Sequence, residues 1–365
     1  SVARAFPTAA TGNSFTAAAI AAPAVAQEAP RVNWRMPSSF PRSLDTVWGS
    51  AELITERVSA LTDGRFSIRA FPAGEIVPPL QVLDAVRNGA TECGHTAGFY
   101  YVGQEPALVF DTGVPFGLTP RQQAAWLRYG GGGPLMAELY ARFDAIAIPC
   151  GNTGAQMGGW FRKPIRTVDD LKGLRIRTPG LLSMVYQKLG AIPQQIAGSD
   201  IYPSLEKGAL DAVEFVGPYD DEKLGFAKVA QYYYGPGVME LGANLSLTVG
   251  RKAWDSLPPR YQAALQAACS EAAIDLLAKY DANNIGALRR LVAQGVKLQS
   301  WPVEVMNAMQ KATGEVLREQ AAAHPSFAKV LENWLAFRDG QILWSSVNDG
   351  AAERFLASTR QSGLK

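Results

Sequence analysis

The residues most able to do chemistry lie in one stretch, from Gly151 to Gly180. Within it, Leu174 to Thr178 alternates apolar and basic residues, which is typical of a half-buried β-strand. Arg177 would then stand at the end of a rigid element, and its planar guanidinium suits a carboxylate, which it meets through two charge-assisted hydrogen bonds. The pattern predicts a site for a small carboxylic acid, unless Arg175 and Arg177 both simply face solvent.

Two acids lie on otherwise apolar segments. Glu214 falls in a predicted strand from Asp211 to Val216, and Glu240 precedes another from Asn244 to Val249. An unpaired carboxylate is costly to bury, so each acid needs a cation or a salt bridge. The sequence leaves open whether these partners serve a site or only the structure.

Several other kinds of site lack their motifs. GxSxG, HExxH and GxGxxG are absent, and the glycines from Gly130 to Gly133 lack the Lys-Ser/Thr of a phosphate-binding loop. We interpret these glycines as a helix end, followed by a helix that begins at Pro134. Two histidines and three scattered cysteines argue against structural zinc. The cysteines allow one internal disulfide at most, or three buried thiols. The histidines are His95 and His324, and the cysteines are Cys93, Cys150 and Cys269.

Strands and helices alternate along the first part of the chain. Strands are predicted at Arg31–Met36 and Phe66–Phe71, and helices at Ser43–Thr62 and Leu80–Arg87. This order predicts an α/β fold with a mainly parallel sheet covered on both faces. Ligands of such folds bind beyond the C-terminal ends of the strands. Phe40 and Tyr100 both fall just after predicted strands, and Tyr101 belongs to the same aromatic cluster as Tyr100.

Long helices dominate the last third. Apolar residues recur every three or four positions from Ser256 to Leu291, which predicts one helix. At 1.5 Å per residue it would be about 50 Å long, enough to lie across two domains. Two more helical segments are predicted, Val303–Arg338 with a break at Pro325, and Asp339–Gln361.

Length and composition narrow the class of protein. A chain of 365 residues exceeds what one core usually supports, so two domains are expected. The formal charge of +2, without a Lys/Arg run, does not suggest nucleic acid or an anionic membrane as partner. Residues 1–27 contain a short apolar run before Ala24-x-Ala26, which we interpret as the remnant of an export signal rather than an Ala-rich tail. No later segment is apolar for about 18 residues, so no transmembrane helix is predicted.

Five longer motifs carry a resemblance to a known family. They are SSFPRSLDT (38–46), HTAGFYY (95–101), GNTGAQMGGWFR (151–162), PQQIAGSDIYPSLEKG (193–208) and VEFVGPYDDEKLGFAKVAQYYY (213–234). These motifs closely resemble those of the DctP-like solute receptors of tripartite ATP-independent periplasmic (TRAP) transporters. The likeness is nearest to the branch that binds α-keto acids such as pyruvate. It implies a two-lobed, hinge-closing periplasmic receptor that delivers its ligand to membrane permease subunits.

The resemblance also implies a division of the chain. Lobe I would hold residues 28–152 and about 244–275, and lobe II residues 153–243 and about 276–338, with the long helix spanning both. Residues 339–365 would form a C-terminal helix. The segment from Ile342 to Phe355 carries apolar residues near one face, and the resemblance implies a homodimer made by exchanging such a helix. The alternative is a helix packed on its own chain.

Site residues follow from the same resemblance. Arg177 matches the arginine that binds the carboxylate, and Asn152 and Tyr100 match polar contacts to the ligand; Phe40, Tyr101 and Gln156 complete the expected substrate contacts. A bridging metal ion would be held by Gln156, Glu214, the main-chain carbonyl of Phe215 and Glu240. The family has tryptophan where this chain has Phe215, so the identity of the substrate stays open.

The charges of these residues favour a metal ion. Two glutamates and a monocarboxylate carry three negative charges, and Arg177 returns one positive charge. The proposed ligands are all oxygens, which suits Ca²⁺ or Na⁺ rather than a transition metal. The receptor hypothesis predicts binding without turnover. The alternative is a metal-assisted lyase or hydrolase acting on a 2-oxo or 2-hydroxy acid, with Glu214 or Glu240 as the base.

Overall fold

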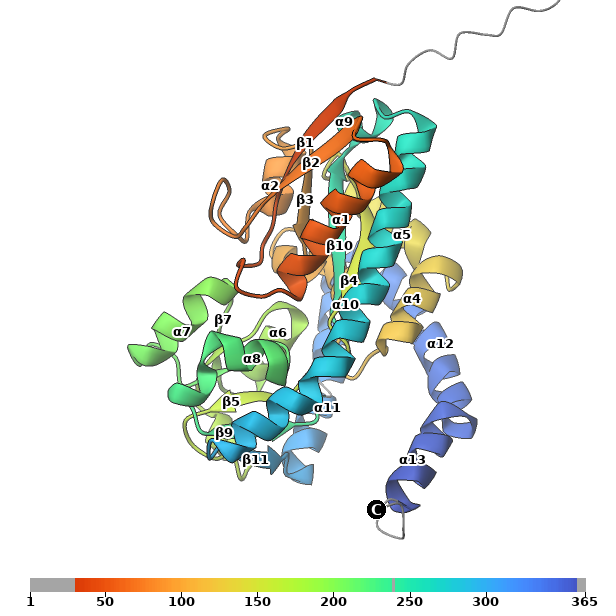
Figure 1. Ribbon diagram of the computed structural model, residues 1–365. Helices are drawn as coiled ribbons and strands as arrows, with labels where there is room; N and C mark the ends of the chain where they lie inside the picture. Colours follow the sequence, from red (N-terminus) through yellow and green to blue (C-terminus); the bar gives the residue numbers. More distant parts are fainter. Residues whose placement is uncertain (1–29, 238–239, 360–365) are drawn as a thin grey trace, which may run out of the picture. The chain divides into compact units, whose positions relative to one another are not determined.

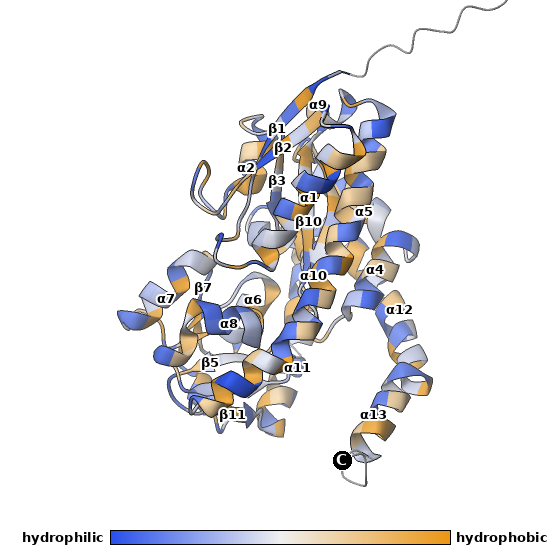
Figure 2. Cartoon of the chain, in the orientation of Figure 1, coloured by the Kyte–Doolittle hydropathy of each residue, from blue (hydrophilic) through white to orange (hydrophobic). Residues whose placement is uncertain are grey.

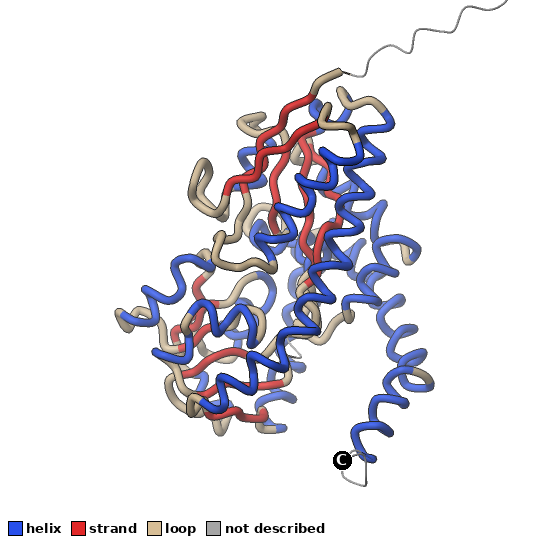
Figure 3. Tube along the Cα trace, viewed as in Figure 1, coloured by secondary structure: helices blue, strands red, loops and turns tan. Residues whose placement is uncertain are grey.

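The computed structural model describes residues 30–237 and 240–359, so the segment assigned to an export signal lies outside the described residues. From Arg31 onward the strands gather in two groups, red in Figure 3, with helices around them. In the first group β3, β10 and β4 form one sheet in that order, and β1 pairs with β2. A bridge between Ser38 and His95 joins the end of β1 to β3. The bounds are Val32–Pro37 for β1, Phe66–Phe71 for β2, Cys93–Thr96 for β3, Ala145–Asn152 for β4 and Asn244–Gly250 for β10.

The second group is a single sheet in the order β11-β9-β5-β8-β6-β7. The strand β7 lies at one edge of this sheet. The bounds are Gly159–Phe161 for β5, Arg175–Arg177 for β6, Ile192–Gln194 for β7, Ala212–Val213 for β8, Tyr232–Gly235 for β9 and Lys297–Ser300 for β11.

In each group one strand runs against all the others, so the predicted mainly parallel arrangement is confirmed, with one antiparallel strand in each group. The pairs β1–β2, β6–β7, β6–β8 and β9–β11 are parallel. In contrast, β10 runs antiparallel to both β3 and β4, and β5 runs antiparallel to both β8 and β9. The β10 strand brings the chain back from the second group to the first, and apolar periodicity reveals such a strand without its direction.

The helix α10 (Pro259–Ala293) confirms the predicted long helix. Its 35 residues correspond to about 52 Å at 1.5 Å per residue. It packs on β4 and on α1 (Val47–Leu61), and then on α8 (Pro218–Leu224) of the second group. Figure 1 shows it running past both groups of strands, so one rigid element connects them.

Shorter helices cover the two groups. The glycines after α4 (Pro120–Tyr129) end that helix as predicted, and Gly131 adopts a left-handed φ of 90° that a residue with a side chain rarely takes. The remaining helices before the C-terminal region are α2 (Val82–Arg87), η1 (Gly98–Tyr101), η2 (Pro106–Leu108), α3 (Val109–Thr112), α4 (Pro120–Tyr129), α5 (Gly132–Ala141), η3 (Val168–Leu171), α6 (Gly180–Lys188), α7 (Gly198–Glu206), η4 (Phe226–Lys228) and α9 (Arg251–Asp255).

Three helices end the described chain: α11 (Val303–Ala323), α12 (Pro325–Val347) and α13 (Asp349–Thr359). The break predicted at Pro325 is confirmed. The boundary predicted at Arg338 is wrong, because α12 continues to Val347. The interruption falls instead at Asn348, whose φ of −127° and ψ of −110° are not helical. Asn, Asp and Gly at 348–350 are residues that favour turns.

The three cysteines, Cys93, Cys150 and Cys269, are free and buried. The structure thus agrees with the alternative of buried thiols and shows no disulfide among them. Burial raises the pKa of each thiol, so these side chains stay protonated and act as small apolar groups of the core.

Candidate ligand and cation site

A small cavity is lined by residues in or near both groups of strands, such as Leu245 in β10 and Arg177 in β6. Its volume is about 20 Å³ for the centre of a water-sized sphere, which suits a ligand of few atoms. Four of the residues expected to contact a substrate line it, as does Phe215. These four are Phe40, Tyr100, Gln156 and Arg177.

Arg177 ends β6 and is only 1% exposed. Its Nε donates to the carbonyl of Ile196 at 3.1 Å and its Nη1 to the carbonyl of Glu214 at 2.8 Å. The guanidinium also lies over the ring of Phe215, 5.4 Å from the ring centre. These contacts fix the orientation of the fork. Arg177 therefore does not face solvent, and the alternative in which both arginines do so is wrong. Arg175 is half exposed and pairs with Asp211 at 2.6 Å.

Oxygen atoms converge around the side chain of Gln156. One atom of its amide lies 2.8 Å from the carbonyl oxygen of Phe215, 2.8 Å from Oε1 of Glu214 and 3.3 Å from Oε2 of Glu240. The other amide atom lies 3.0 Å from Oγ1 of Thr153. The other three predicted cation ligands therefore all lie within contact distance of the Gln156 amide.

The amide of Gln156 can face these oxygens in two ways. With its nitrogen toward them, it donates hydrogen bonds to the carbonyl and to both glutamates. With its oxygen toward them, four oxygens meet, and a cation or protons on the glutamates must hold them together. Thr153 accommodates both orientations, because its hydroxyl can either donate or accept. The residues therefore fit a site with and without a metal ion.

The two glutamates are unusual in being buried without an ion pair. Glu214 is 2% exposed and Glu240 is 7% exposed, and within the described part of the chain no lysine or arginine forms a salt bridge with either carboxylate. Burial raises the pKa of Glu214 well above its ordinary value, and the nearby Glu240 raises it further. Burial also raises the pKa of Glu240 to about 8, against the opposing charge of Arg177. Such a pair favours a bound cation.

The ligand types select the kind of cation. Two carboxylates, one amide and one carbonyl are all oxygen ligands, which suit Ca²⁺ or Na⁺. Oxygens that share a calcium ion at roughly 2.4 Å stand about 3 Å apart, close to the spacings around Gln156. Among the described residues no group of three or more His, Cys, Asp or Glu is arranged to hold a metal.

Two predicted contacts lie elsewhere. The side-chain oxygen of Asn152 accepts a hydrogen bond from the backbone of Gly154 at 3.0 Å, and Asn152 lines an open groove instead of the cavity. The hydroxyl of Tyr101 accepts from the backbone of Leu83 at 3.0 Å and lies 2.9 Å from Oγ1 of Thr96. Both residues shape the surrounding backbone in this structure and do not line the cavity.

Eight residues that line the cavity were not predicted from the sequence. Some of them, such as Thr153 beside Asn152, are sequence neighbours of predicted site residues. This proximity is the only feature of the sequence that could have indicated them. The others are small or apolar side chains that look like ordinary core residues. The eight are Val47, Ala97, Phe99, Thr153, Pro179, Val216, Ala243 and Leu245.

Comparison with known families decides the class of this protein. Residues 38–324 match the bacterial extracellular solute-binding proteins, family 7, also called DctP. The chain belongs to this family. It is 49% identical to a monocarboxylate 2-oxoacid-binding periplasmic protein of Nostoc sp. over 91% of each chain.

Solved structures support the assignment to solute receptors of TRAP transporters. A receptor from Bordetella bronchiseptica matches with a TM-score of 0.90 and 49% identity, over 92% of this chain and 100% of that one. That structure is a dimer with copurified calcium and picolinate in one active site, while the other is apo. A receptor from Pseudoalteromonas atlantica, with bound sodium and pyruvate, matches with a TM-score of 0.86 and 37% identity, over 89% and 99% of the chains.

These findings confirm the predicted two-lobed periplasmic receptor fold and its family. The family consists of solute-binding proteins that serve transporters, which favours the receptor hypothesis over the lyase or hydrolase. Its members bind small solutes outside the cytoplasm and work with permease components in the membrane. Within the described residues no helix is long and apolar enough to cross a membrane.

Proposed function

We propose that this receptor binds a small 2-oxo monocarboxylate, such as pyruvate or 2-oxobutyrate, and passes it to a TRAP permease. The observation that carries the proposal is the placement of a fixed, buried Arg177 next to four converging oxygens. Arg177 would hold the carboxylate of the ligand. Gln156, Glu214, the carbonyl of Phe215 and Glu240 would hold Ca²⁺ or Na⁺, which would neutralise the glutamates and bind ligand oxygens.

The remaining residues at the cavity define the class of ligand. Phe40 and Leu245 belong to an apolar lining, and Arg177 is the one cationic residue among the described residues that line the cavity. A second carboxylate on the ligand would therefore meet apolar groups and lose its hydration without compensation. This arrangement favours short monocarboxylates. We also propose that the lobes divide near the limits given by the resemblance, with β10 and α10 passing between them.

Calorimetry of calcium-loaded protein tests the function. Pyruvate and 2-oxobutyrate should saturate a single site, and 2-oxoglutarate should bind at least about 100-fold more weakly because its second carboxylate is desolvated. NMR of the same mixtures should show unchanged ligand after prolonged incubation. Absence of pyruvate binding in both calcium and sodium would refute the ligand class, and consumption of pyruvate would revive the enzyme hypothesis.

We further propose that the chain forms a homodimer through its C-terminal helices. From Arg338 onward no described side chain is buried, and α13 has no buried residue. Figure 2 shows hydrophobic residues on α13, and large apolar side chains on α12 and α13 are 56–70% exposed. Exposed apolar groups at this density mark an interaction surface. They are Ile342, Leu343, Trp344, Val347, Phe355 and Leu356.

A groove of the same chain offers a place for this helix from a second copy. It lies along α4 and α10 and is lined by Leu127, Ala273, Ile274 and Leu277 among others, and Ile274 is 72% exposed. A two-fold axis would let each copy insert its helix into the groove of the other. The dimer of the Bordetella bronchiseptica receptor is consistent with this proposal.

Light scattering tests the dimer. A chain that ends at Arg338 should be monomeric, and Phe355→Glu should weaken the full-length dimer by at least about tenfold, since it buries an unpaired charge. The matched control is Ile76→Glu, an exposed apolar residue outside this region. Equal masses for the truncated and full-length chains would exclude the exchange.

A further inference from the structure

Two segments that line the cavity also touch each other outside it. Residues 40–47 contribute Phe40 and Val47 to the lining, and the segment that leads into α8 contributes Phe215 and Val216. The contacts between the segments involve residues 45 and 46 on one side and residues 219, 220 and 223 on the other. None of these five residues lines the cavity.

The first contact is buried. The hydroxyl of Thr46 donates to the carboxylate of Asp220, with distances of 2.6 and 2.8 Å to its two oxygens. Tyr280 of α10 donates to the same carboxylate at 2.5 Å. Thr46 is 1% exposed and Asp220 is 0% exposed. Burial raises the pKa of Asp220, and the hydrogen bonds from Thr46 and Tyr280 oppose this shift.

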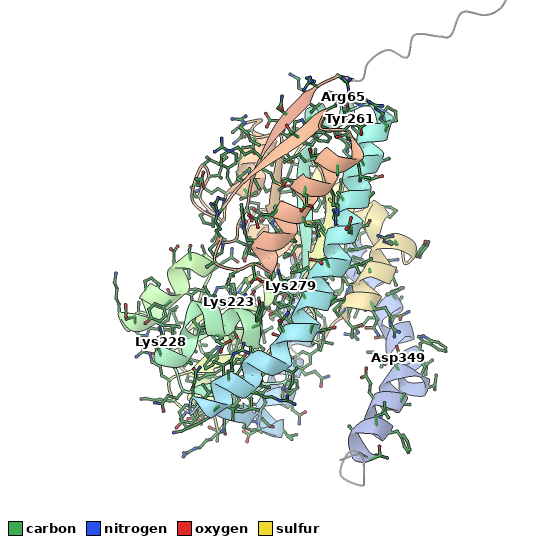
Figure 4. All side chains as sticks on the ribbon, viewed as in Figure 1. Arg65, Lys223, Lys228, Tyr261, Lys279 and Asp349 are labelled. Carbon is green, nitrogen blue, oxygen red and sulfur yellow. The ribbon has the colours of Figure 1, made fainter. Side chains whose placement is uncertain are left out.

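The second contact is charged and partly exposed. The carboxylate of Asp45 accepts from the ammonium of Lys223 and from the hydroxyl of Tyr219, the latter at 3.2 Å. Lys279 of α10 lies 3.1 Å from Oδ2 of Asp45 and donates to its main-chain carbonyl at 2.6 Å. Figure 4 shows Lys223 and Lys279 near each other, from α8 and α10. Partial burial would raise the pKa of Asp45, but the hydrogen bonds from both lysines outweigh it and lower the pKa.

We propose that these contacts form a latch, which joins the two cavity-lining segments and sets how long the ligand stays bound. The latch consists of Asp45, Thr46, Tyr219, Asp220 and Lys223, with Lys279 supporting it from α10. Its residues act on the ligand only through the neighbouring wall residues, so they are positioning residues. The retention of ligand rests on the proposed function, whereas the closure of the segments does not.

The contacts that make up the latch favour slow release of the ligand. It joins positions that are 174 and 178 residues apart in the sequence, so it can form only when the two segments meet. Contacts that exist only in the closed arrangement stabilise that arrangement selectively. Breaking them should speed dissociation more than it changes association, since release requires the segments to separate.

Stopped-flow kinetics with calcium-loaded protein and pyruvate provide the first test. Asp45→Asn should raise the dissociation rate about fivefold to tenfold, because partly exposed ion pairs contribute modestly, and should leave the association rate within about twofold. The matched control is Glu222→Gln, which removes another ion pair of α8, with Arg290 of α10 at 2.7 Å. This control should leave both rates unchanged, although it loses a similar surface contact.

Removal of both charges provides the second test. The double variant Asp45→Asn with Lys223→Gln should dissociate no faster than Asp45→Asn alone, because both changes break the same ion pair. If Asp45 and Lys223 acted independently, the effects of the two single variants would add. Equal dissociation rates for wild type, Asp45→Asn and Glu222→Gln would overturn the role in retention.

A measurement without ligand separates the latch from the proposed function. Spin labels at Glu52→Cys on α1 and Ser199→Cys on α7 occupy exposed positions, and the native cysteines are buried, so labelling is selective. Asp45→Asn should shift the distance distribution toward longer values, while Glu222→Gln should not. If this shift occurs in a protein that binds no pyruvate, the proposed ligand is wrong and the latch stands. If pyruvate binds but the distributions are identical, the latch is wrong.

Discussion

Replacing Arg177 with alanine should weaken pyruvate binding by about a thousandfold. Removing the partner of a desolvated charge costs roughly 4 kcal/mol, and each 1.4 kcal/mol is a factor of ten. Arg177 is buried, and two main-chain carbonyls and the ring of Phe215 hold it in place. Its orientation is thus set before any ligand arrives, so most of its interaction energy would be available for binding.

Arg177→Lys should recover little of this loss. An ammonium can replace the charge, but it cannot contact the carbonyls of Ile196 and Glu214 and also present a planar fork to a carboxylate. Calorimetric titration of pyruvate into calcium-loaded wild type and both variants measures the effect. Affinity of Arg177→Lys within about threefold of wild type would show that the carboxylate is not held by a fork.

Two controls make the result specific. Arg175→Ala changes an arginine two positions earlier in β6, which pairs with Asp211 at the surface, and it should bind pyruvate like wild type. Calcium binding without pyruvate should become tighter in Arg177→Ala, because the two glutamates lose a nearby positive charge. Tighter calcium binding in that variant would also prove that the site is folded.

Removal of the metal should have the second large effect. Protein treated with chelator and desalted should bind 2-oxobutyrate at least about 100-fold more weakly, because the anion would then enter a site with two unneutralised or protonated glutamates. Calcium or sodium should restore the affinity. By linkage, 2-oxobutyrate should strengthen cation binding by the same factor.

The cation affinity should depend on pH in a defined direction. Burial raises the pKa of Glu240 to about 8 and that of Glu214 well above its ordinary value, so these carboxyls hold protons in the metal-free protein near neutral pH. The cation binds the ionised form and must displace the protons. Calcium affinity should therefore rise as the pH increases toward 8 and fall as the pH decreases below that value.

Substitution of Glu240 tests whether the two glutamates take part in cation and ligand binding. Glu240→Gln keeps an oxygen but removes a charge, so it should weaken both calcium and 2-oxobutyrate binding. The matched control is Asp111→Asn, another buried carboxyl, which accepts from Tyr140 at 2.7 Å and Ser246 at 2.9 Å away from the cavity lining. Identical dissociation constants for 2-oxobutyrate in metal-free and metal-loaded wild type would mean that the glutamates serve only the structure.

The sequence predicted the buried charged residues Arg177, Glu214 and Glu240, because their signals are local. Arg177 ends a strand with alternating polarity, and Glu214 and Glu240 interrupt apolar segments that bury them. The 3.6-residue periodicity of α10 also predicted a helix long enough to pass both groups of strands. Residues that no local pattern distinguishes, such as Val47 and Ala243, were missed.

Tertiary structure decided which of these residues meet. Parallel pairing of β6 with β8 sets Arg177 opposite Val213, so Glu214 follows beside the arginine. The direction of β10, the position of Gln156 at the cavity and the position of Asn152 away from it depend on pairings between distant segments. The same holds for the latch, where Asp45 meets Lys223 across 178 positions. Local periodicity specifies which face of an element is apolar, whereas the partner of that face is fixed only when the whole chain packs.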